Sequence, residues 1–270
     1  MQIYLSALLC LLAVSCTAQP KEQAADKVHT PSFEQIRNRF NDFFLSQEEK
    51  ILRCTTRCAG LSLANEEQKR FEAAYKVLGP KREWIVLVDP SHGLAKDYRP
   101  QDLVDKWNTG WPKRAQLRGE AMEQMMKMIE AAQKDGVRLV PISTYRTWQY
   151  QDRLYQQNLA RNNGKPSGYV ARAGESQHHL GTAVDFNTVN PADENIPALI
   201  WLRKHAGEYG FSLSFPKEAE AEKESGYPYE AWHYRYITRE AVRLQDEFFN
   251  GNQHKTLTFL NDCYFAQQAQ

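Results

Sequence analysis

The 270-residue chain lacks an excess of charge of either sign, since 34 Lys and Arg residues nearly balance 33 Asp and Glu residues for a formal net charge of +1. Proteins that bind nucleic acid or an acidic membrane surface through electrostatics usually carry a clear basic excess. The composition therefore gives no reason to expect a nucleic-acid partner. Internal repeats and low-complexity segments are also missing, and the length suits one large core with a small accessory region.

Cysteine is scarce, and no C-x-x-C pair is present, which disfavours a cysteine-based zinc site. Beyond the first eighteen residues only Cys54, Cys58 and Cys263 occur. On a helix, Cys54 and Cys58 would share one face about 6 Å apart, near the upper limit for a disulfide. The sequence leaves open whether these two residues form a disulfide or are buried thiols. The G-x-S-x-G pattern of serine hydrolases is likewise missing, so no serine nucleophile is evident.

Long apolar runs are missing except at the N-terminus, where residues 1–18 contain no charged side chain. The run is shorter than the roughly 20 residues that cross a bilayer, and small residues follow it, as in a secretory signal. Cleavage after Ala18 would release the protein. Alternatively, "LAVSC" ending at Cys16 resembles the lipobox of bacterial lipoproteins, and a lipid on Cys16 would tether the chain to a membrane. The sequence predicts export to the periplasm or cell envelope and favours the lipoprotein.

Composition and periodicity divide the chain into four parts. Residues 1–18 are the predicted signal peptide, and residues 19–80 are a polar leader followed by a helical region with an apolar stripe. Residues 81–260 form the predicted main domain, and residues 261–270 are a short tail. The stripe of the N-terminal helical region indicates packing against the main domain, with binding of a partner as the alternative.

The main domain mixes strand and helix patterns. The runs "WIVLV" at residues 84–88 and "VRLVPIS" at residues 137–143 predict strands. Apolar positions at helical spacing predict helices at residues 118–136, 147–163, 196–210 and 239–251. Because strands and helices do not alternate regularly, the fold class expected is α+β.

The stretch "SQHHLGTAVDF" at residues 176–186 suggests a binding site. His178 and His179 are adjacent, so in an extended chain their side chains point in opposite directions and only one of them faces a shared site. Asp185 lies an odd number of positions from His178, and a plain strand would not align the two. Gly181 allows a turn between them, which could fold Asp185 back towards His178.

A second stretch, "EAWHYRY", supplies Glu230 and His233. A zinc hydrolase needs three protein ligands and an acid/base that is not itself a ligand. His178, Asp185 and His233 would fill the first role, and Glu230 would exchange the proton of the attacking water. The alternative for Glu230 is a solvated carboxylate in a polar loop. Two imidazoles and a carboxylate could also hold another divalent ion.

These segments resemble a known family. "SQHHLGTAVDF" fits the S-x-H-x-x-G-x-A-x-D pattern of VanY-type D-alanyl-D-alanine carboxypeptidases, and "EAWHYRY" fits their E-x-W-H-x-R-Y element. "STYRTWQYQ" is similar to the S-x-Y-R-[ST] element, and "LVDPSHGLAKDYRPQDLV" to the opening strand and loop. The resemblance covers about residues 82–260 and implies a small central antiparallel sheet flanked by helices, with one zinc ion bound on the sheet. The wider group also contains D,D-dipeptidases, endopeptidases and hedgehog-type domains.

The resemblance also implies roles for single residues. The zinc ligands would be the three residues named above, the catalytic base would be Glu230, and His179 would fall at a position without a ligand role. Arg146 matches the family's substrate-binding arginine, whose donors suit a peptide carboxylate or the oxyanion formed during attack. Gln151 and Ser176 would support substrate binding.

The sequence thus predicts an exported zinc metallopeptidase that removes the terminal D-alanine of peptidoglycan stem peptides. The alternatives are an L,D-carboxypeptidase, an endopeptidase of the same group, or a zinc-containing cell-wall binding module without turnover. A pure binding module has no need for Glu230 or Arg146, so their presence favours an enzyme.

Overall fold

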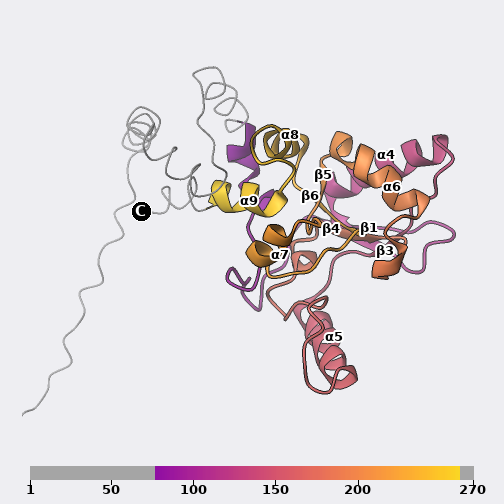
Figure 1. Cartoon of the computed structure of the whole chain (residues 1–270). Coiled ribbons are helices and arrows are strands. Elements are labelled where there is room, and N and C mark those ends of the chain that lie inside the picture. Colours follow the sequence, from indigo (N-terminus) through magenta and orange to yellow (C-terminus); the bar gives the residue numbers. More distant parts are fainter. Residues whose placement is uncertain (1–76, 262–270) are drawn as a thin grey trace, which may run out of the picture.

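The structure is a computed structural model that describes residues 77–261 (Figure 1). Several predictions fall outside these residues: the signal peptide, the possible lipidation of Cys16 and most of the N-terminal helical region. The three remaining cysteines and all but the first residue of the predicted C-terminal tail also lie outside them. The boundaries predicted for the four parts of the chain therefore stay predictions.

A four-stranded antiparallel sheet lies at the centre of the described residues. Its strand order is β3-β4-β6-β5. The strands are β3 (Pro141–Ser143), β4 (Ala183–Phe186), β5 (Phe211–Leu213) and β6 (His233–Tyr236). A separate antiparallel pair precedes the sheet and consists of β1 (Leu103–Lys106) and β2 (Ala115–Arg118).

Helices surround this sheet. The α-helices are α4 (Gly119–Lys134), α5 (Trp148–Arg161), α6 (Pro197–His205), α7 (Ala219–Ser225), α8 (Arg239–Phe248) and α9 (Gln253–Thr258). Short 3₁₀-helices are η1 (Gly79–Trp84), η2 (Gln177–Leu180), η3 (Pro191–Asp193) and η4 (Ala206–Tyr209). No helix within residues 77–261 is long and apolar enough to cross a membrane.

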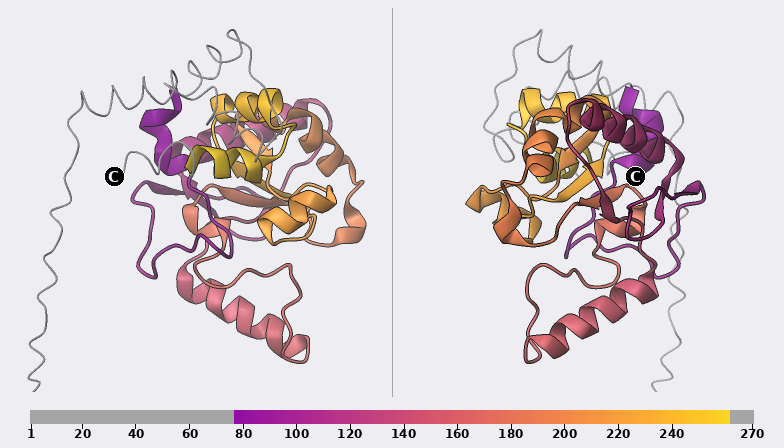
Figure 2. Two further views of the ribbon diagram at one scale, coloured as in Figure 1. Left: turned by 60° about the vertical axis from the view of Figure 1, so that its left-hand side comes forward. Right: turned by 90° about the vertical axis from the view of Figure 1, so that its right-hand side faces the viewer.

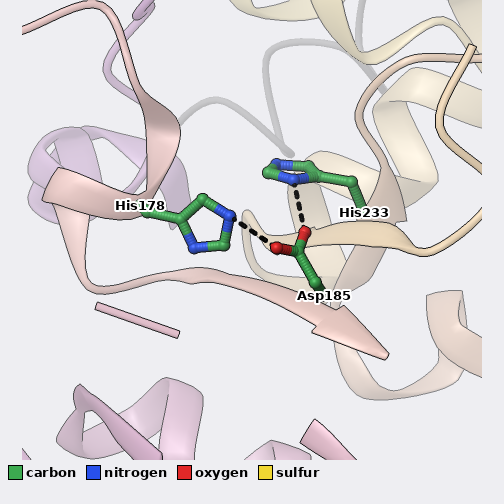
Figure 3. A group of neighbouring side chains, drawn as sticks. All are labelled: His178, Asp185 and His233. Carbon is green, nitrogen blue, oxygen red and sulfur yellow. Dashed lines mark hydrogen bonds and ion pairs between the residues drawn. The ribbon is translucent and has the colours of Figure 1, made fainter. Parts of the chain in front are cut away.

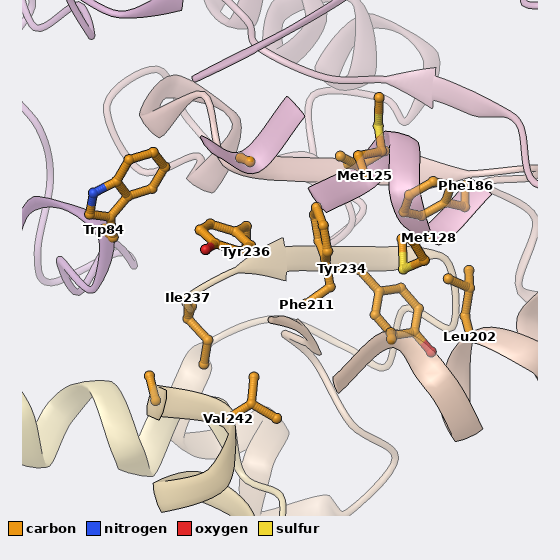
Figure 4. Close-up of a cluster of buried hydrophobic side chains, with 14 of the residues drawn as sticks. Trp84, Met125, Met128, Phe186, Leu202, Phe211, Tyr234, Tyr236, Ile237 and Val242 are labelled. Atoms are coloured by element: carbon orange, nitrogen blue, oxygen red, sulfur yellow. The ribbon is translucent and has the colours of Figure 1, made fainter. Parts of the chain in front are cut away.

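The hydrophobic core lies on one face of the sheet. Alternate residues of β4 and β6 supply Val184, Phe186, Tyr234 and Tyr236 to it, as the two-residue period of a strand requires. Helices α4, α6 and α8 cover this face with apolar side chains that include Met125, Met128, Leu202 and Val242 (Figure 4). Helix α5 extends away from the body on the other side (Figure 2). The core thus occupies one face of β4 and β6 and leaves His233 and Asp185 on the other.

The α+β prediction is confirmed, and each of the four helices predicted in the main domain is present with slightly shorter bounds. The strand predicted at residues 84–88 is wrong, because this segment forms no ladder with another strand. Side chains take the place of a neighbouring strand. Arg235 donates to the carbonyl oxygens of Trp84 and Val86 at 3.0 and 2.8 Å, and Asn261 donates to that of Ile85 at 2.8 Å. The strand predicted at residues 137–143 is present only at its end, as β3.

A buried aspartate connects the loop after this segment to helix α9. The Asp89 carboxylate lies 2.9 Å from Nδ1 of His92 and 3.0 Å from Nε2 of His254, and it accepts a hydrogen bond from the backbone N–H of Ser91. Burial alone would raise the pKa of Asp89, but the hydrogen bonds from His254, His92 and Ser91 outweigh it and lower the pKa to about 2. The ionised form is therefore favoured by folding.

Asp89→Asn is expected to lower the free energy of unfolding by about 1–2 kcal/mol at pH 7, because the variant lacks the charge that these donors stabilise. A carboxylate whose pKa is lowered in the folded state stabilises the protein above its unfolded pKa, and this contribution is lost as the pH falls through the folded value. The unfolding midpoints of wild type and variant should therefore converge between about pH 4 and pH 2. Denaturant titrations followed by circular dichroism would measure this, and a constant difference down to pH 2 would contradict it.

Candidate metal centre

Strand pairing brings two of the predicted ligands together. In the register of β4 and β6, Asp185 lies opposite His233, and in that of β3 and β4 it lies opposite Ser143. Directly opposed residues in an antiparallel sheet place their side chains on the same face a few ångströms apart. Ser143, Asp185 and His233 thus form a row across three strands, on the face that the core leaves free.

A turn at Gly181, within the stretch at residues 176–186, brings the third predicted ligand, His178, close to the other two. His178 lies in η2, which ends at Gly181 with a φ of +66°. A Cβ at this glycine would come within 2.7 Å of the Leu103 side chain, so both the backbone conformation and the space favour glycine. The chain then reverses into β4 and returns to Asp185. The expected turn at Gly181 is therefore present.

His178, Asp185 and His233 converge as the sequence predicts (Figure 3). Nε2 of His178 lies 3.2 Å from one carboxylate oxygen of Asp185, and Nδ1 of His233 lies 2.9 Å from the other. One ligand atom from each residue lies within 4.8 Å of the others, and all three side chains are buried. Among the residues that the structure describes, this is the only such group of three.

The outer hydrogen bonds determine which nitrogen of each imidazole faces the group. Nδ1 of His178 lies 2.7 Å from the carbonyl oxygen of Thr144, so it carries the proton and Nε2 keeps its lone pair. Nε2 of His233 lies 3.1 Å from Oε1 of Gln177, so in that ring Nδ1 keeps the lone pair. In these tautomers two lone pairs and a carboxylate point at one another, an arrangement that a cation between them would stabilise. The donor set fits a divalent metal ion.

Electrostatics favours the protonation states that a metal ion needs. Burial, together with the charge of Arg146, lowers the pKa of His178 to about 4 against the opposing effect of Asp185. Burial would raise the pKa of Asp185, but His178, His233 and Arg146 hold it well below its usual range. His178 is thus neutral and Asp185 ionised near neutral pH, which are the forms that bind metal.

Glu230 lies beside this group and is not one of its three members. Its Oε2 is 3.6 Å from Nδ1 of His233, and only 6% of the residue is exposed. Burial, with the negative charge of Asp185 added, raises the pKa of Glu230 well above its usual range, although Arg146 and a hydrogen bond from Trp232 act in the opposite direction. The alternative reading of Glu230 as a solvated carboxylate is therefore wrong. A buried carboxyl group with a raised pKa next to a metal site is typical of a general acid/base.

Arg146 is held by three side chains. Its guanidinium donates to Oγ of Ser143 at 3.0 and 2.8 Å, to Oε1 of Gln151 at 3.2 Å and to Oδ2 of Asp185 at 2.8 Å. Gln151 is itself fixed by a 2.7 Å hydrogen bond to the carbonyl oxygen of Ala171. These four contacts among the described residues use four of the five N–H groups of arginine. Arg146 thus orients Asp185 and keeps one donor for a ligand.

A cleft of about 330 Å³ opens onto the group. Arg146, Ser176, Glu230 and the three candidate ligands line it, whereas Gln151 lies behind Arg146. The other lining residues include Gln177, residues of α5 and the loop after it, and aromatic side chains, among them Leu154, Asn158, Tyr169, Phe215, Tyr227 and Trp232. The volume and the mixture of apolar walls with convergent polar groups are those of a small-molecule or peptide-end site.

The structure also gives two predicted residues a local role. Ser176 caps η2, where its Oγ accepts a 3.4 Å hydrogen bond from the backbone N–H of His178. His179 faces away from the candidate ligands, with Nδ1 2.7 Å from the carbonyl oxygen of Arg146 and Nε2 accepting from the N–H of Gly174. Both ring nitrogens of His179 are thus engaged in the scaffold, in keeping with its predicted lack of a ligand role.

Sequence reasoning missed the residues that fix the ligands. Gln177 and the carbonyl group of Thr144 set the two imidazole tautomers, and Ser143 holds Arg146. Gln177 stands at a variable position of the motif pattern, and a backbone carbonyl leaves no signature in side-chain identity. Ser143 is the serine of the S-x-Y-R-[ST] element, so the motif marked the residue, although it did not indicate the contact with Arg146.

Comparison with known proteins agrees with this geometry. Residues 114–239 match the family model described as "VanY: D-alanyl-D-alanine carboxypeptidase". A curated relative from Bacillus subtilis (strain 168), named "Putative carboxypeptidase YodJ", is 29% identical over 171 residues. That match covers 59% of this chain and 62% of the relative, so the chain spans less than two thirds of the relative's length.

Two solved structures share the fold. The LdcB LD-carboxypeptidase is 28% identical with a TM-score of 0.57, and the match covers 64% of this chain and 86% of that one. A mutant of the vancomycin resistance D,D-pentapeptidase VanY, in complex with Zn(II), is 24% identical with a TM-score of 0.53, over 65% and 99% of the two chains. The predicted relationship and the predicted fold, a small antiparallel sheet flanked by helices, are thereby confirmed.

Proposed function

Since residues 114–239 form a domain of the VanY family of D-alanyl-D-alanine carboxypeptidases, we propose that the protein is a zinc-dependent D,D-carboxypeptidase of peptidoglycan stem peptides. The observation that carries this proposal is the convergence of two imidazole lone pairs and a carboxylate beside a buried glutamate, at the floor of a cleft. Metal ligands, an acid/base and a binding site for a peptide end are the parts that such an enzyme needs.

The metal would be held by His178, Asp185 and His233. Two imidazoles and a carboxylate form a ligand set that suits zinc and leaves a further coordination position open. A zinc ion bound there would polarise the substrate carbonyl and lower the pKa of water. The similar VanY D,D-pentapeptidase structure is a complex with Zn(II), which supports the same choice of metal here.

Glu230 would act first as a base and then as an acid. It takes a proton from the attacking water, whose oxygen adds to the carbonyl carbon of the terminal amide bond. When the C–N bond breaks, the same carboxyl group returns the proton to the departing amine, so that D-alanine leaves with a neutralised nitrogen. A dication bound by the neighbouring ligands would favour the ionised form of Glu230. It would therefore counteract the rise in the pKa of Glu230 that burial and Asp185 cause.

Arg146 would bind the negatively charged part of the substrate. Its guanidinium lines the cleft and keeps one N–H group after its contacts with Ser143, Gln151 and Asp185. This donor suits either the terminal carboxylate of the peptide or the oxyanion that forms during attack. Ser176 also lines the cleft and would support substrate binding there.

An L,D-carboxypeptidase is the second candidate, because the LdcB LD-carboxypeptidase has the same fold at 28% identity. The two activities share the metal site and the base. They differ in the residue before the scissile bond, which is D-alanine in a pentapeptide and an L-configured residue in a tetrapeptide. The shape of the cleft, whose lining includes Tyr169 and Trp232, would determine which of these residues fits.

A panel of stem peptides would distinguish the candidates. We expect the purified full chain with zinc to release D-alanine from a pentapeptide ending in D-Ala-D-Ala, and to do so much faster than from the corresponding tetrapeptide. Mass spectrometry of the products would measure both rates and reveal any cleavage of internal bonds. Preference for the tetrapeptide would instead establish the L,D-activity, and cleavage of internal bonds alone would establish an endopeptidase.

The proposed substrate lies outside the cytoplasm, and we propose that the chain is exported to the cell envelope. Its uncharged, largely apolar N-terminus supports this, and Cys16 would provide a lipid anchor if the lipobox-like sequence is processed. Mass spectrometry of the mature protein from membrane and soluble fractions would test it. A mature chain that retains residue 1 would contradict export by this route.

A further inference from the structure

Gln177 contacts the candidate metal ligand His233 at Nε2, the ring nitrogen that does not face Asp185. It is the first residue of η2, directly before His178, and 7% of it is exposed. Its side-chain oxygen Oε1 lies 2.8 Å from Oγ of Ser214, which donates to it, and 3.1 Å from Nε2 of His233. Ser214 is also fixed to β6, because its backbone N–H donates to the carbonyl oxygen of His233 at 3.1 Å. One amide oxygen thus receives two donors within a buried network.

We propose that Gln177 is a positioning residue whose side-chain oxygen holds His233 in the tautomer that presents Nδ1 to the metal ion. The inference rests on the proposed function, because it requires that His178, Asp185 and His233 bind zinc. Gln177 lines the cleft beside the candidate ligands but is not one of the three residues that would bind the metal. Its side-chain oxygen accepts a hydrogen bond from the protonated ring nitrogen of His233, as outer hydrogen-bond partners of metal-binding histidines generally do.

The orientation of the amide group decides the tautomer. A neutral imidazole carries one proton, and an acceptor at Nε2 keeps that proton away from Nδ1. The opposite amide orientation would direct an N–H group at Nε2 and place the ring proton on Nδ1, which lies 2.9 Å from Asp185. That proton would occupy the space between the ligands. In the structure the amide oxygen faces both Nε2 of His233 and the hydroxyl group of Ser214.

Gln177 also connects two ligands that are distant in the sequence. The same 3₁₀-helix carries His178 as a ligand and Gln177 as the partner of His233. For His178 the corresponding acceptor is the backbone carbonyl of Thr144, which no side-chain substitution removes. Gln177 is therefore the outer partner whose contribution to metal binding substitution can isolate.

Zinc affinity of the full chain, measured by competition with a chromophoric chelator, tests the proposal. We expect Gln177→Leu to weaken zinc binding about 10–100-fold, the range found when outer partners of metal ligands are removed. Gln177→Glu retains an acceptor oxygen and should stay close to wild type. The visible absorption spectrum of the Co²⁺-loaded protein provides a second measure, and we expect it to change in Gln177→Leu but not in Gln177→Glu.

Gln245 supplies a matched control. Its Oε1 accepts a 2.6 Å hydrogen bond from Oγ of Ser212, so it forms a similarly buried Ser–Gln pair that contacts none of the three candidate ligands. Gln245→Leu should lower the melting temperature of the metal-free protein and leave zinc affinity unchanged. Equal zinc affinity in wild type and Gln177→Leu, or equal losses in Gln177→Leu and Gln177→Glu, would overturn the positioning role. Failure of wild type itself to bind zinc would overturn the proposed metal site, and the inference with it.

Discussion

Glu230→Gln is expected to slow the release of D-alanine by about 10²–10⁴-fold, the contribution that a positioned acid/base makes to such a reaction. The amide has nearly the same shape as the carboxyl group but cannot exchange a proton with water or with the leaving amine. Glu230 is not one of the three converging ligand residues, so the variant should still bind one zinc ion with near wild-type affinity. Stopped assays of D-alanine release, with metal analysis of the same samples, would measure both quantities.

Glu175 offers a control for this substitution. It is another glutamate that lines the cleft, and its side chain makes no contact with the three candidate ligands. Glu175→Gln should therefore leave the rate of bond cleavage close to wild type. If Glu230→Gln retained wild-type turnover, a base other than Glu230 would have to be assigned. If it lost zinc together with activity, Glu230 would instead belong among the metal ligands.

Asp185→Asn is expected to remove zinc and to lower turnover by about 10³-fold or more, because several kcal/mol of charge stabilisation depend on the metal. The carboxylate supplies the only negative charge among the three ligands and also accepts from Arg146. An asparagine side chain keeps the shape but loses the charge that two imidazoles and a dication require. Treatment of wild type with a chelator should reproduce the loss, and added zinc should restore activity to the treated wild type but not to the variant.

Asp89→Asn provides the comparison for a general effect on folding. Asp89 is likewise buried and contacts two histidines, yet it lies outside the cleft. We expect this variant to be less stable than wild type and still to bind zinc and release D-alanine. Zinc bound to Asp185→Asn with wild-type affinity would contradict the assignment of the ligands.

The sequence predicted the candidate ligands because two short motifs of the resemblance carry them, and the spacing within the first motif reflects local backbone geometry. Gly181 indicates the turn that reverses the chain, and the two-residue period of a strand then places Asp185 on one face. The contacts that select the tautomers could not be predicted in this way. Thr144 acts through its backbone carbonyl, and Ser214 reaches Gln177 only when β5 and η2 are assembled.

The incorrect prediction of a strand at residues 84–88 has a similar physical origin. The β-branched run at residues 84–88 has the composition of a strand, but a strand also requires a neighbour with free backbone groups. Arg235 and Asn261 supply the donors for three of its carbonyl groups, from positions about 150 residues or more further along the chain. Arg235 is itself completely buried, and burial lowers its pKa to about 9. No local pattern distinguishes a segment bonded by distant side chains from one bonded by another strand.

The row formed by Ser143, Asp185 and His233 across three strands has a consequence for how the chain folds. Strands β4 and β6 are buried on both faces, so burial alone distinguishes weakly between their two possible faces. A shift of one residue would turn Asp185 away from His233. Zinc can bind only to the arrangement in which both residues face the same side, and binding stabilises that arrangement by mass action. The metal would therefore select the native pairing during maturation, and a chain that folded without it would lose part of the discrimination against misaligned strands.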